Sequence, residues 1–258
     1  MFAKLTAIRL AVVLVVVGLW SVAVNQDWVD PNLVPSPASV AATLRDLLGD
    51  ATFLDHAVTT LVRVLIAFVI GSPLAIITGF LIAERGSSQK SYAPIIYFLM
   101  GVPQSIFLPV FIQIFGVGSL QKVVFGITHL YFALTAITIA AARSVSPHFV
   151  LAARSFGAGR ARIYWSIYFR AMLPTLINGL RMALIFDIVG VLAAEMYASR
   201  NGLGQVIMAW GEEYRAPEMM AAVLLISAVT ILLNEAMAAL QRAFSPASAA
   251  SAIQGVHA

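Results

Sequence analysis

The stretch AVTTLVRVLIAFVIGSPLAIITGFLIA, residues 57–83, decides the fold class, because Arg63 is its only ionisable residue. A helix needs about 20 apolar residues to cross the ~30 Å hydrocarbon layer of a membrane, since each residue adds about 1.5 Å. The stretch is too long and too continuously apolar for a barrel strand, in which apolar and polar residues alternate. It therefore predicts a membrane-spanning α-helix.

Five further stretches have the same character, so the sequence predicts an all-α membrane protein with six transmembrane helices. They are Ala7–Val24, Ala93–Phe115, Val123–Ala142, Leu173–Ala194 and Met219–Leu240. The first of them follows Lys4 and Arg9 and has the outline of a secretory signal, but Ser21–Asn25 matches a cleavage site weakly. We therefore interpret it as an uncleaved first span.

The composition agrees with a membrane protein and excludes several other classes. Apolar residues make up 60% of the chain and charged residues only 11%, whereas a soluble domain carries about 25% charged residues. The net charge of +4 is not gathered into a basic stripe with interleaved aromatic residues, so nucleic acid is not an expected partner. The chain has no cysteine and its four histidines lack ligand spacing, so no metal site is expected.

The positive charges predict the direction of the helices. If the N-terminus is cytoplasmic, the inner segments hold ten Lys and Arg residues and the outer segments four, while nine acidic residues lie outside. Cytoplasmic loops of membrane proteins carry an excess of Lys and Arg. We therefore expect a multi-pass protein with both termini in the cytoplasm.

The predicted spans divide the chain into four parts. Residues 1–24 form the first transmembrane helix, and residues 25–56 form an external segment with a surface helix around Val40–Leu44. Residues 57–240 form a five-helix core, which contains a cytoplasmic loop, residues 143–172, between the fourth and fifth spans. Residues 241–258 form a cytoplasmic tail.

The cytoplasmic loop is rich in arginine and contains no acidic residue. Ser146-Pro147 is a typical helix start, and Gly157 has the backbone freedom that a left-handed helix end needs. A second short helix is expected from Arg160 to Trp165. Two helices that meet at a glycine and mix apolar with cationic side chains fit a protein partner, and fit equally a segment that lies on anionic lipid.

The spacing within this loop resembles that of the inner-membrane permeases of binding-protein-dependent ATP-binding cassette importers. Their loop carries Glu-Ala-Ala, three residues, Gly, nine residues and then Ile-x-Leu-Pro. This chain has Leu151-Ala152-Ala153, Gly157 and Ile167 at those distances. The resemblance implies a coupling helix that docks in a groove of an ATPase subunit. Its implied contact residues are Leu151, Ala152, Ala153, Gly157, Arg160 and Arg162.

The loop departs from the family pattern at two places. Leu151 stands where the family usually has Glu, and Phe169-Arg170 replaces Leu-Pro, although Leu173-Pro174 follows four residues later. Without this carboxylate, one polar contact with the ATPase is in question. The departure is also compatible with a second permease subunit whose loop matches the pattern better.

Other segments resemble the branch of this family that imports sulfonates, taurine, nitrate, bicarbonate and related small anions. They are Pro35-Ser36-Pro37 with Val40 and Leu44, His56 with Thr60–Val64, Phe115–Gly118 before Lys122, Gly179-Leu180-Arg181, and Val191–Met196 leading to Gly202-Leu203-Gly204. These segments occur in the family's order. The resemblance implies the type I importer fold, a place in the bacterial inner membrane and a small anionic solute.

No ATP site is expected on this chain. A phosphate-binding loop needs Gly-x-x-x-x-Gly-Lys-[Ser/Thr], and none of Lys4, Lys90 and Lys122 follows a glycine. ATP and Mg²⁺ are therefore expected on a separate ATPase, and this chain is expected to be no enzyme and to hold no cofactor. The resemblance implies two permease subunits, identical or different, two ATPases, an external solute-binding protein and surrounding lipid.

Ionisable and helix-breaking residues inside the spans mark a candidate transport path. A charge near the middle of the bilayer costs at least ~2.5 kcal/mol, so it usually faces water or a partner. Asp187 is the most deeply placed, and we expect it to line the path or to pair with Arg63, although Arg63 can instead extend its guanidinium outward. Pro103 and Gln104 bring a kink and a polar group to the third span, which fits a gate wall or a simple packing adjustment.

Two other functions are compatible with the sequence. A secondary transporter would use an ion gradient, with Asp187 and Arg63 as its coupling pair. A non-transporting scaffold would bind lipid or a regulator through the loop. The identity of the solute is not readable from this chain, because the external binding protein does most of the selecting in such importers.

Overall fold

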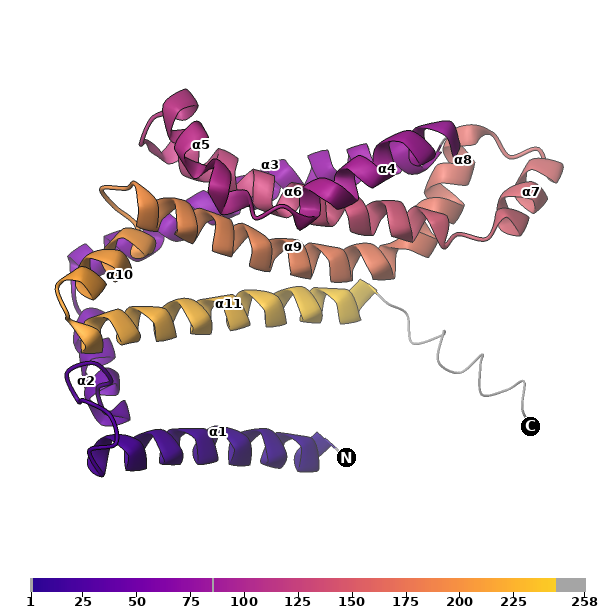
Figure 1. Cartoon of the computed structure of the whole chain (residues 1–258). Helices are drawn as coiled ribbons and strands as arrows, with labels where there is room; N and C mark the ends of the chain where they lie inside the picture. The colour runs from indigo at the N-terminus through magenta and orange to yellow at the C-terminus, as the bar shows by residue number, and fades with distance from the viewer. Residues whose placement is uncertain (1, 85, 245–258) are drawn as a thin grey trace. The chain divides into compact units, whose positions relative to one another are not determined.

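The computed structural model describes residues 2–84 and 86–244, and this part of the chain is helical without a strand. The helices are α1 (Phe2–Asn25), α2 (Pro37–Leu47), α3 (Ala51–Glu84), α4 (Gly86–Gly101), α5 (Leu108–Phe115), α6 (Ser119–Arg143), α7 (Pro147–Ser155), α8 (Arg160–Ile163), α9 (Arg170–Tyr197), α10 (Leu203–Glu212) and α11 (Ala216–Phe244) (Figure 1). The chain forms two compact units. Of the described residues, the smaller unit contains 2–60 and 195–229, and the larger unit contains 61–84, 86–194 and 230–244.

Within the described residues, four helical segments are long and apolar enough to cross a membrane. They are Ala51–Glu84, Ser119–Arg143, Arg160–Tyr197 and Ala216–Ala239. They coincide with four of the six predicted spans and confirm the all-α membrane fold. α3 is longer than predicted, because it begins at Ala51 instead of Ala57. At about 1.5 Å per residue it is longer than the ~30 Å hydrocarbon layer requires.

The predicted third span, Ala93–Phe115, is broken and not merely kinked. Its two helical parts, Ser87–Gly101 and Gln104–Phe115, bend by 85° at the break. Pro103 has extended backbone, with φ −60° and ψ 102°, and begins the short 3-10 turn η1 (Gln104–Phe107). Proline has no backbone N–H and disfavours helical conformation in the residue before it, so the helix ladder ends here.

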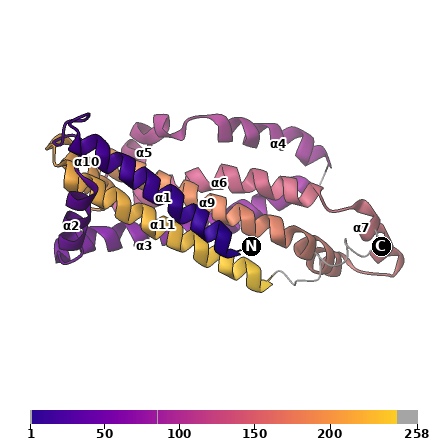
Figure 2. The ribbon, with the colours of Figure 1, turned by 90° about the horizontal axis from the view of Figure 1, so that it is seen from below.

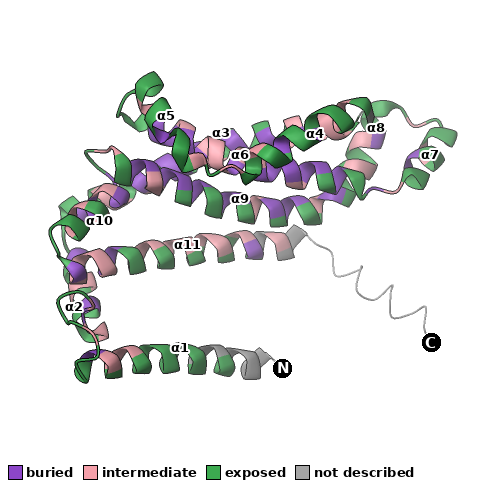
Figure 3. Ribbon diagram, in the orientation of Figure 1, coloured by how far each residue is buried: buried purple, intermediate pink, exposed green. Residues whose placement is uncertain are grey.

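α1 coincides with the predicted first span, but its described apolar part, Ala11–Asn25, is shorter than a full membrane span. The described side chains of α1 are exposed along most of the helix (Figure 3). That α1 crosses the membrane stays a prediction, as does the cytoplasmic position of both termini. Most of the predicted tail, residues 245–258, lies outside the described residues.

α6 forms the centre of the larger unit, where most of its side chains are buried (Figure 3). α4 packs along α6 on one side (Figure 2). α3 and α9 approach α6 so closely that glycines are required at the contacts. A Cβ atom at Gly79 of α3 would lie 2.7 Å from Thr138 Cβ, and one at Gly126 of α6 would lie 2.5 Å from Asp187 Oδ1. Small residues at helix contacts are the usual means of close packing in membranes.

The smaller unit contains the predicted surface helix, which is α2. Ser36 begins this helix and accepts a hydrogen bond from Ser39 N at 3.2 Å, with Pro37 in the first turn. Val40 of α2 is completely buried. A helix is therefore present around Val40–Leu44, and its place on the outer membrane surface stays a prediction.

Candidate functional site

The loop of residues 143–172, which the sequence predicts to be cytoplasmic, lies in the larger unit and is built around the end of α7. Gly157 has a φ of +75°, the left-handed conformation that its position in the sequence predicts. Ala158 N donates to Ala153 O and Gly157 N donates to Arg154 O, both at 2.9 Å. These two bonds satisfy carbonyl groups that the end of a helix otherwise leaves unpaired. Ser146 stands at the start of α7, but its side chain forms no capping hydrogen bond there.

The second short helix of the loop is not separate, contrary to the prediction. α8 runs through a π-helical turn, η2 (Tyr164–Phe169), directly into α9, so Arg160–Tyr197 is one continuous helical segment. No glycine or proline lies between Arg160 and Pro174, so nothing in the sequence ends the helix. The loop is therefore joined rigidly to the fifth predicted span.

The tip of the loop presents apolar side chains to the outside. Phe156 is 90% exposed, Phe149 65% and Leu151 58%, while Val150 turns inward and is buried. A contiguous exposed apolar patch is typical of a surface that interacts with a protein or a membrane. The other predicted contact residues lie on the same loop: Ala152, Gly157, Arg160 and Arg162 are exposed, and Ala153 is half-buried. Figure 2 shows α7 beyond the ends of α6 and α9.

The base of the loop is held against the last turns of α3. The Tyr164 hydroxyl donates a hydrogen bond to the Glu84 carboxylate. The ring of Phe80 meets the rings of Tyr164 and Tyr168 edge-on, at centroid distances of 5.5 and 5.7 Å. Such contacts add stability beyond the buried area. The loop is therefore attached to α3 as well as to α9.

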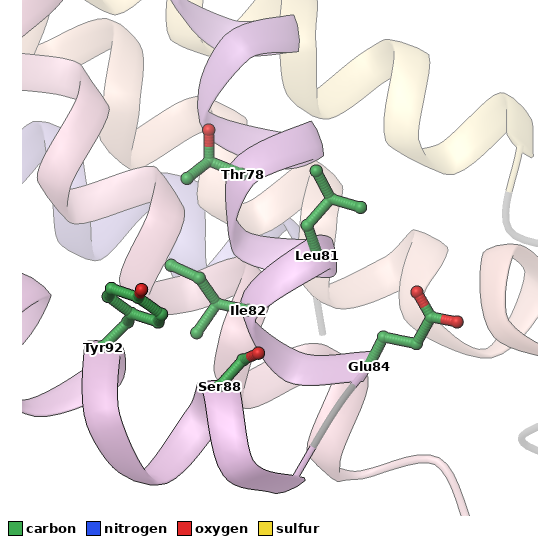
Figure 4. A pocket seen from close by; sticks show the side chains of 6 residues that line it. All are labelled: Thr78, Leu81, Ile82, Glu84, Ser88 and Tyr92. Atoms are coloured by element: carbon green, nitrogen blue, oxygen red, sulfur yellow. The ribbon is translucent and has the colours of Figure 1, made fainter.

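Glu84 also borders a cavity of about 360 Å³ between the end of α3 and the start of α4. Figure 4 shows Ser88 and Tyr92 of α4 beside Ile82 of α3, with the Glu84 side chain pointing away from them. The Glu84 carboxylate thus contacts the loop, through Tyr164, and does not point toward α4 (Figure 4).

Two of the predicted path residues, Pro103 and Gln104, lie together at the break between α4 and α5. The Gln104 side-chain oxygen is buried and has no hydrogen-bond partner among the described residues. A buried amide oxygen without a partner costs about 1–3 kcal/mol in a static structure. The break between α4 and α5 therefore contains a polar side chain, that of Gln104, as the sequence predicts, and its oxygen has no partner among the described residues.

The other two path residues, Asp187 and Arg63, are both buried in the larger unit. Neither oxygen of Asp187 has a hydrogen-bond partner within the described chain, so the predicted pairing with Arg63 is wrong. Arg63 is 3% exposed and donates to Ser119 Oγ from Nε at 3.2 Å and from Nη2 at 2.9 Å. Ser119 is the exposed first residue of α6, so Arg63 reaches an end of this helix, and the alternative that Arg63 extends outward stays a prediction.

Two buried charges were not foreseen from the sequence. Lys122 is completely buried at the start of α6, where its Nζ donates to Val117 O at 2.6 Å. Glu195, at the end of α9, is completely buried in the smaller unit. The sequence predicts both to lie in outer segments, because each stands at the boundary between an apolar stretch and a connection.

The buried Glu195 lies where two of the segments that resemble the importer family come together, the one around His56 and Thr60 and the one that leads to Gly202 and Gly204. Its Oε2 accepts hydrogen bonds from Thr60 Oγ1 at 2.8 Å and from Gly204 N at 3.0 Å. His56 Nδ1 accepts from Gly202 N at 2.9 Å. Gly202 has a φ of +106°, and a Cβ atom there would lie 2.4 Å from the Glu195 carboxyl group. The start of α3 and the α9–α10 connection thus form one polar corner, and only glycine fits at position 202.

No group of three or more His, Cys, Asp or Glu residues with metal-binding geometry occurs in the described part of the chain. The expected site residues do not form a single cluster. The residues predicted to contact an ATPase lie on the loop of residues 143–172, Pro103 and Gln104 lie at the α4–α5 break, and Arg63 and Asp187 lie within the larger unit.

Comparison with protein families gives a match over most of the chain. The model of the family described as binding-protein-dependent transport system inner membrane component matches residues 52–249. The taurine transport system permease protein TauC of Escherichia coli (strain K12) is 30% identical over 236 residues, which cover 88% of this chain and 84% of that protein. A Bacillus subtilis (strain 168) permease protein named for the transport of aliphatic sulfonates, SsuC, is 22% identical and covers 88% of this chain and 83% of that protein.

The fold also matches a solved structure. The MetNI methionine ABC transporter in an inward-facing conformation contains a chain that superimposes with a TM-score of 0.60 at 20% sequence identity. The match covers 81% of this chain and 95% of that chain.

Proposed function

We propose that this chain, which belongs to the family of binding-protein-dependent transport system inner membrane components, imports an organic sulfonate or a related small anion. It is a membrane-spanning permease subunit of an ABC importer. The substrate class rests on one observation, the 30% identity with a taurine permease over 88% of this chain. The similarity to a permease named for aliphatic sulfonates supports the same class.

The energy for import comes from a separate ATPase, to which ATP and Mg²⁺ bind. The exposed tip of the loop, with Leu151, Phe156 and Gly157, docks on that ATPase, and Arg160 and Arg162 supply oriented donors beside it. Leu151 makes an apolar contact where the family pattern has a carboxylate. Two such permeases, identical or different, work with two ATPases and an external solute-binding protein, and both termini of this chain are cytoplasmic.

The transport path uses polar groups that the static structure leaves without partners. Gln104 supplies an oxygen at the α4–α5 break, which Pro103 creates, and Asp187 supplies a carboxyl group within the bundle. Arg63 borders the same bundle through its contact with Ser119. Buried polar residues of membrane proteins usually face a partner or water in one of the states that the protein adopts.

The substrate class is tested by uptake into proteoliposomes that hold the assembled permease and ATPase, with the solute-binding protein outside. We expect ATP-dependent uptake of radiolabelled taurine or of a short alkanesulfonate, and its inhibition by the other unlabelled sulfonate. Methionine serves as the control solute and should neither enter nor compete. ATP-driven uptake of methionine without uptake of any sulfonate would overturn the proposed class.

Attachment of the ATPase is tested by co-purification. The ATPase should remain bound to the wild-type chain and to a chain with Arg200→Glu, a cation outside the loop. It should be lost with the double substitution Gly157→Asp and Arg160→Glu. Retention of the ATPase by the double variant would contradict the proposed docking surface.

A further inference from the structure

An apolar groove of about 260 Å³ runs along the larger unit beside the loop. One wall is formed by the inner half of α3 and the other by η2 and the first turns of α9. The lining residues with the largest exposed surfaces are Ile77, Leu81, Trp165 and Phe169. Trp165 and Phe169 stack in parallel with their centroids 4.8 Å apart, so they form a flat wall. The groove has almost no polar surface and fits a hydrocarbon chain.

A polar cavity of about 120 Å³ adjoins this groove on the side of the loop. Tyr164 and Tyr168 line both spaces, so the two are neighbours. Arg154 and Arg160 contribute two cations to the polar cavity, against one acid, Glu84, which already accepts the Tyr164 hydrogen bond. The cavity therefore has an excess of positive charge and fits an anionic group.

We propose that the groove and the polar cavity together form a binding site for an anionic phospholipid of the cytoplasmic leaflet. The acyl chain lies in the groove against Leu81, Trp165 and Phe169, and the phosphate group lies beside Arg154 and Arg160. Arginine donates to phosphate with good geometry, and basic residues at the cytoplasmic membrane surface attract anionic lipid. The order of the two spaces along the helix, apolar first and cationic toward the loop, matches the order of acyl chain and headgroup.

The site is compatible with a docked ATPase. Phe156, Leu151 and Phe149 are exposed at the tip of the loop and none of them lines either space. Arg160 belongs to both sites, and the rest of the lipid site lies where the loop meets the end of α3. The inference does not depend on which solute is transported.

The test uses Trp165 as a fluorescent reporter in the full chain, with Trp20, Trp28 and Trp210 replaced by phenylalanine. The protein is reconstituted in mixed vesicles of phosphatidylcholine and phosphatidylglycerol, in which one of the two lipids carries dibrominated acyl chains that quench tryptophan. We expect phosphatidylglycerol to bind beside Trp165 roughly fivefold more strongly than phosphatidylcholine. The cavity has one more cation than it has acids, and this ratio is the attraction of one basic residue for an anionic lipid.

Three variants make the result decisive. Arg154→Gln with Arg160→Gln should abolish the preference, whereas Arg162→Gln, a cation that does not line the cavity, should keep it. A reporter moved to α3 by Val69→Trp with Trp165→Phe should show no preference, because Val69 is 66% exposed outside the groove. Equal binding of the two lipids at Trp165 would overturn the proposal. So would a Trp165 that neither brominated lipid quenches, since protein and not lipid would then cover the groove.

Discussion

Gly157 is the one described residue of the loop 143–172 with a left-handed backbone conformation. Its φ of +75° is unfavourable for any residue with a side chain, although no atom lies within 4 Å of a Cβ built there. The cost of a substitution is therefore one of backbone conformation and not of space. Gly159 has an equally open environment, but its φ of −68° suits any residue.

This difference predicts that Gly157→Ala lowers ATP-driven uptake, because the left-handed conformation costs roughly 1–2 kcal/mol more for alanine and loosens the end of α7. Gly159→Ala is the matched control and should leave uptake unchanged. Uptake into proteoliposomes, normalised to the amount of inserted protein, measures both. Equal uptake by the two variants would show that the left-handed turn is not needed for coupling.

The left-handed conformation of Gly157 was predictable, because a glycine that follows a helical pattern commonly ends the helix in this conformation. The sequence did not allow the burial of Lys122 and Glu195 to be predicted. Their partners, such as Val117 O and Thr60, come from backbone or from distant positions. Arg63 was misjudged for the same reason, since Ser119 lies on another helix.

At the scale of helices, the larger unit depends on the close contact of α6 with α3 and α9. Gly126 of α6 faces Asp187 and Val191 of α9, and a Cβ atom there would lie 2.5 Å from Asp187 Oδ1 and 2.7 Å from Val191 Cγ2. Neither neighbour can withdraw easily, because both are buried.

Gly126→Ala should therefore lower the stability of the purified protein by about 1–3 kcal/mol, the usual cost of overpacking a core. Gly101→Ala is the control, since nothing lies within 4 Å of a Cβ atom at that position. Thermal unfolding in detergent measures the difference. An equal melting temperature for both variants would mean that α6 and α9 are not in close contact.

The contact between the loop and α3 is the second helix-scale feature with a measurable consequence. Tyr164→Phe removes the hydrogen bond to Glu84 and keeps the ring against Phe80. We expect ATP hydrolysis by the assembled complex to continue while uptake per ATP falls, because the loop then moves without α3. In Tyr168→Phe the ratio should stay at the wild-type value, since the Tyr168 hydroxyl has no hydrogen bond within the described residues. A wild-type ratio of uptake to hydrolysis in Tyr164→Phe would exclude this role.

The helices themselves were largely predictable, because length and continuous apolarity are visible in the sequence. Breaks were harder to predict. Pro103 indicated a kink in the third span, but the 85° bend also depends on how α5 packs against α6. The continuity of α8 with α9 was missed, although no residue between Arg160 and Pro174 ends a helix.

At the scale of the whole molecule, the chain has apolar spans, a loop with an exposed apolar tip and no phosphate-binding motif. It belongs to a family of transport permeases and therefore needs an external source of energy. Within the described residues, the buried acid Asp187 forms no hydrogen bond to Arg63, the partner that an ion-driven mechanism was predicted to use.

Uptake by the reconstituted complex under separate control of ATP and ion gradients tests this account most directly. We predict that uptake requires ATP inside the vesicles and continues when ionophores collapse every ion gradient. Uptake by this chain alone, without ATP, that stops when a gradient is collapsed would contradict the account.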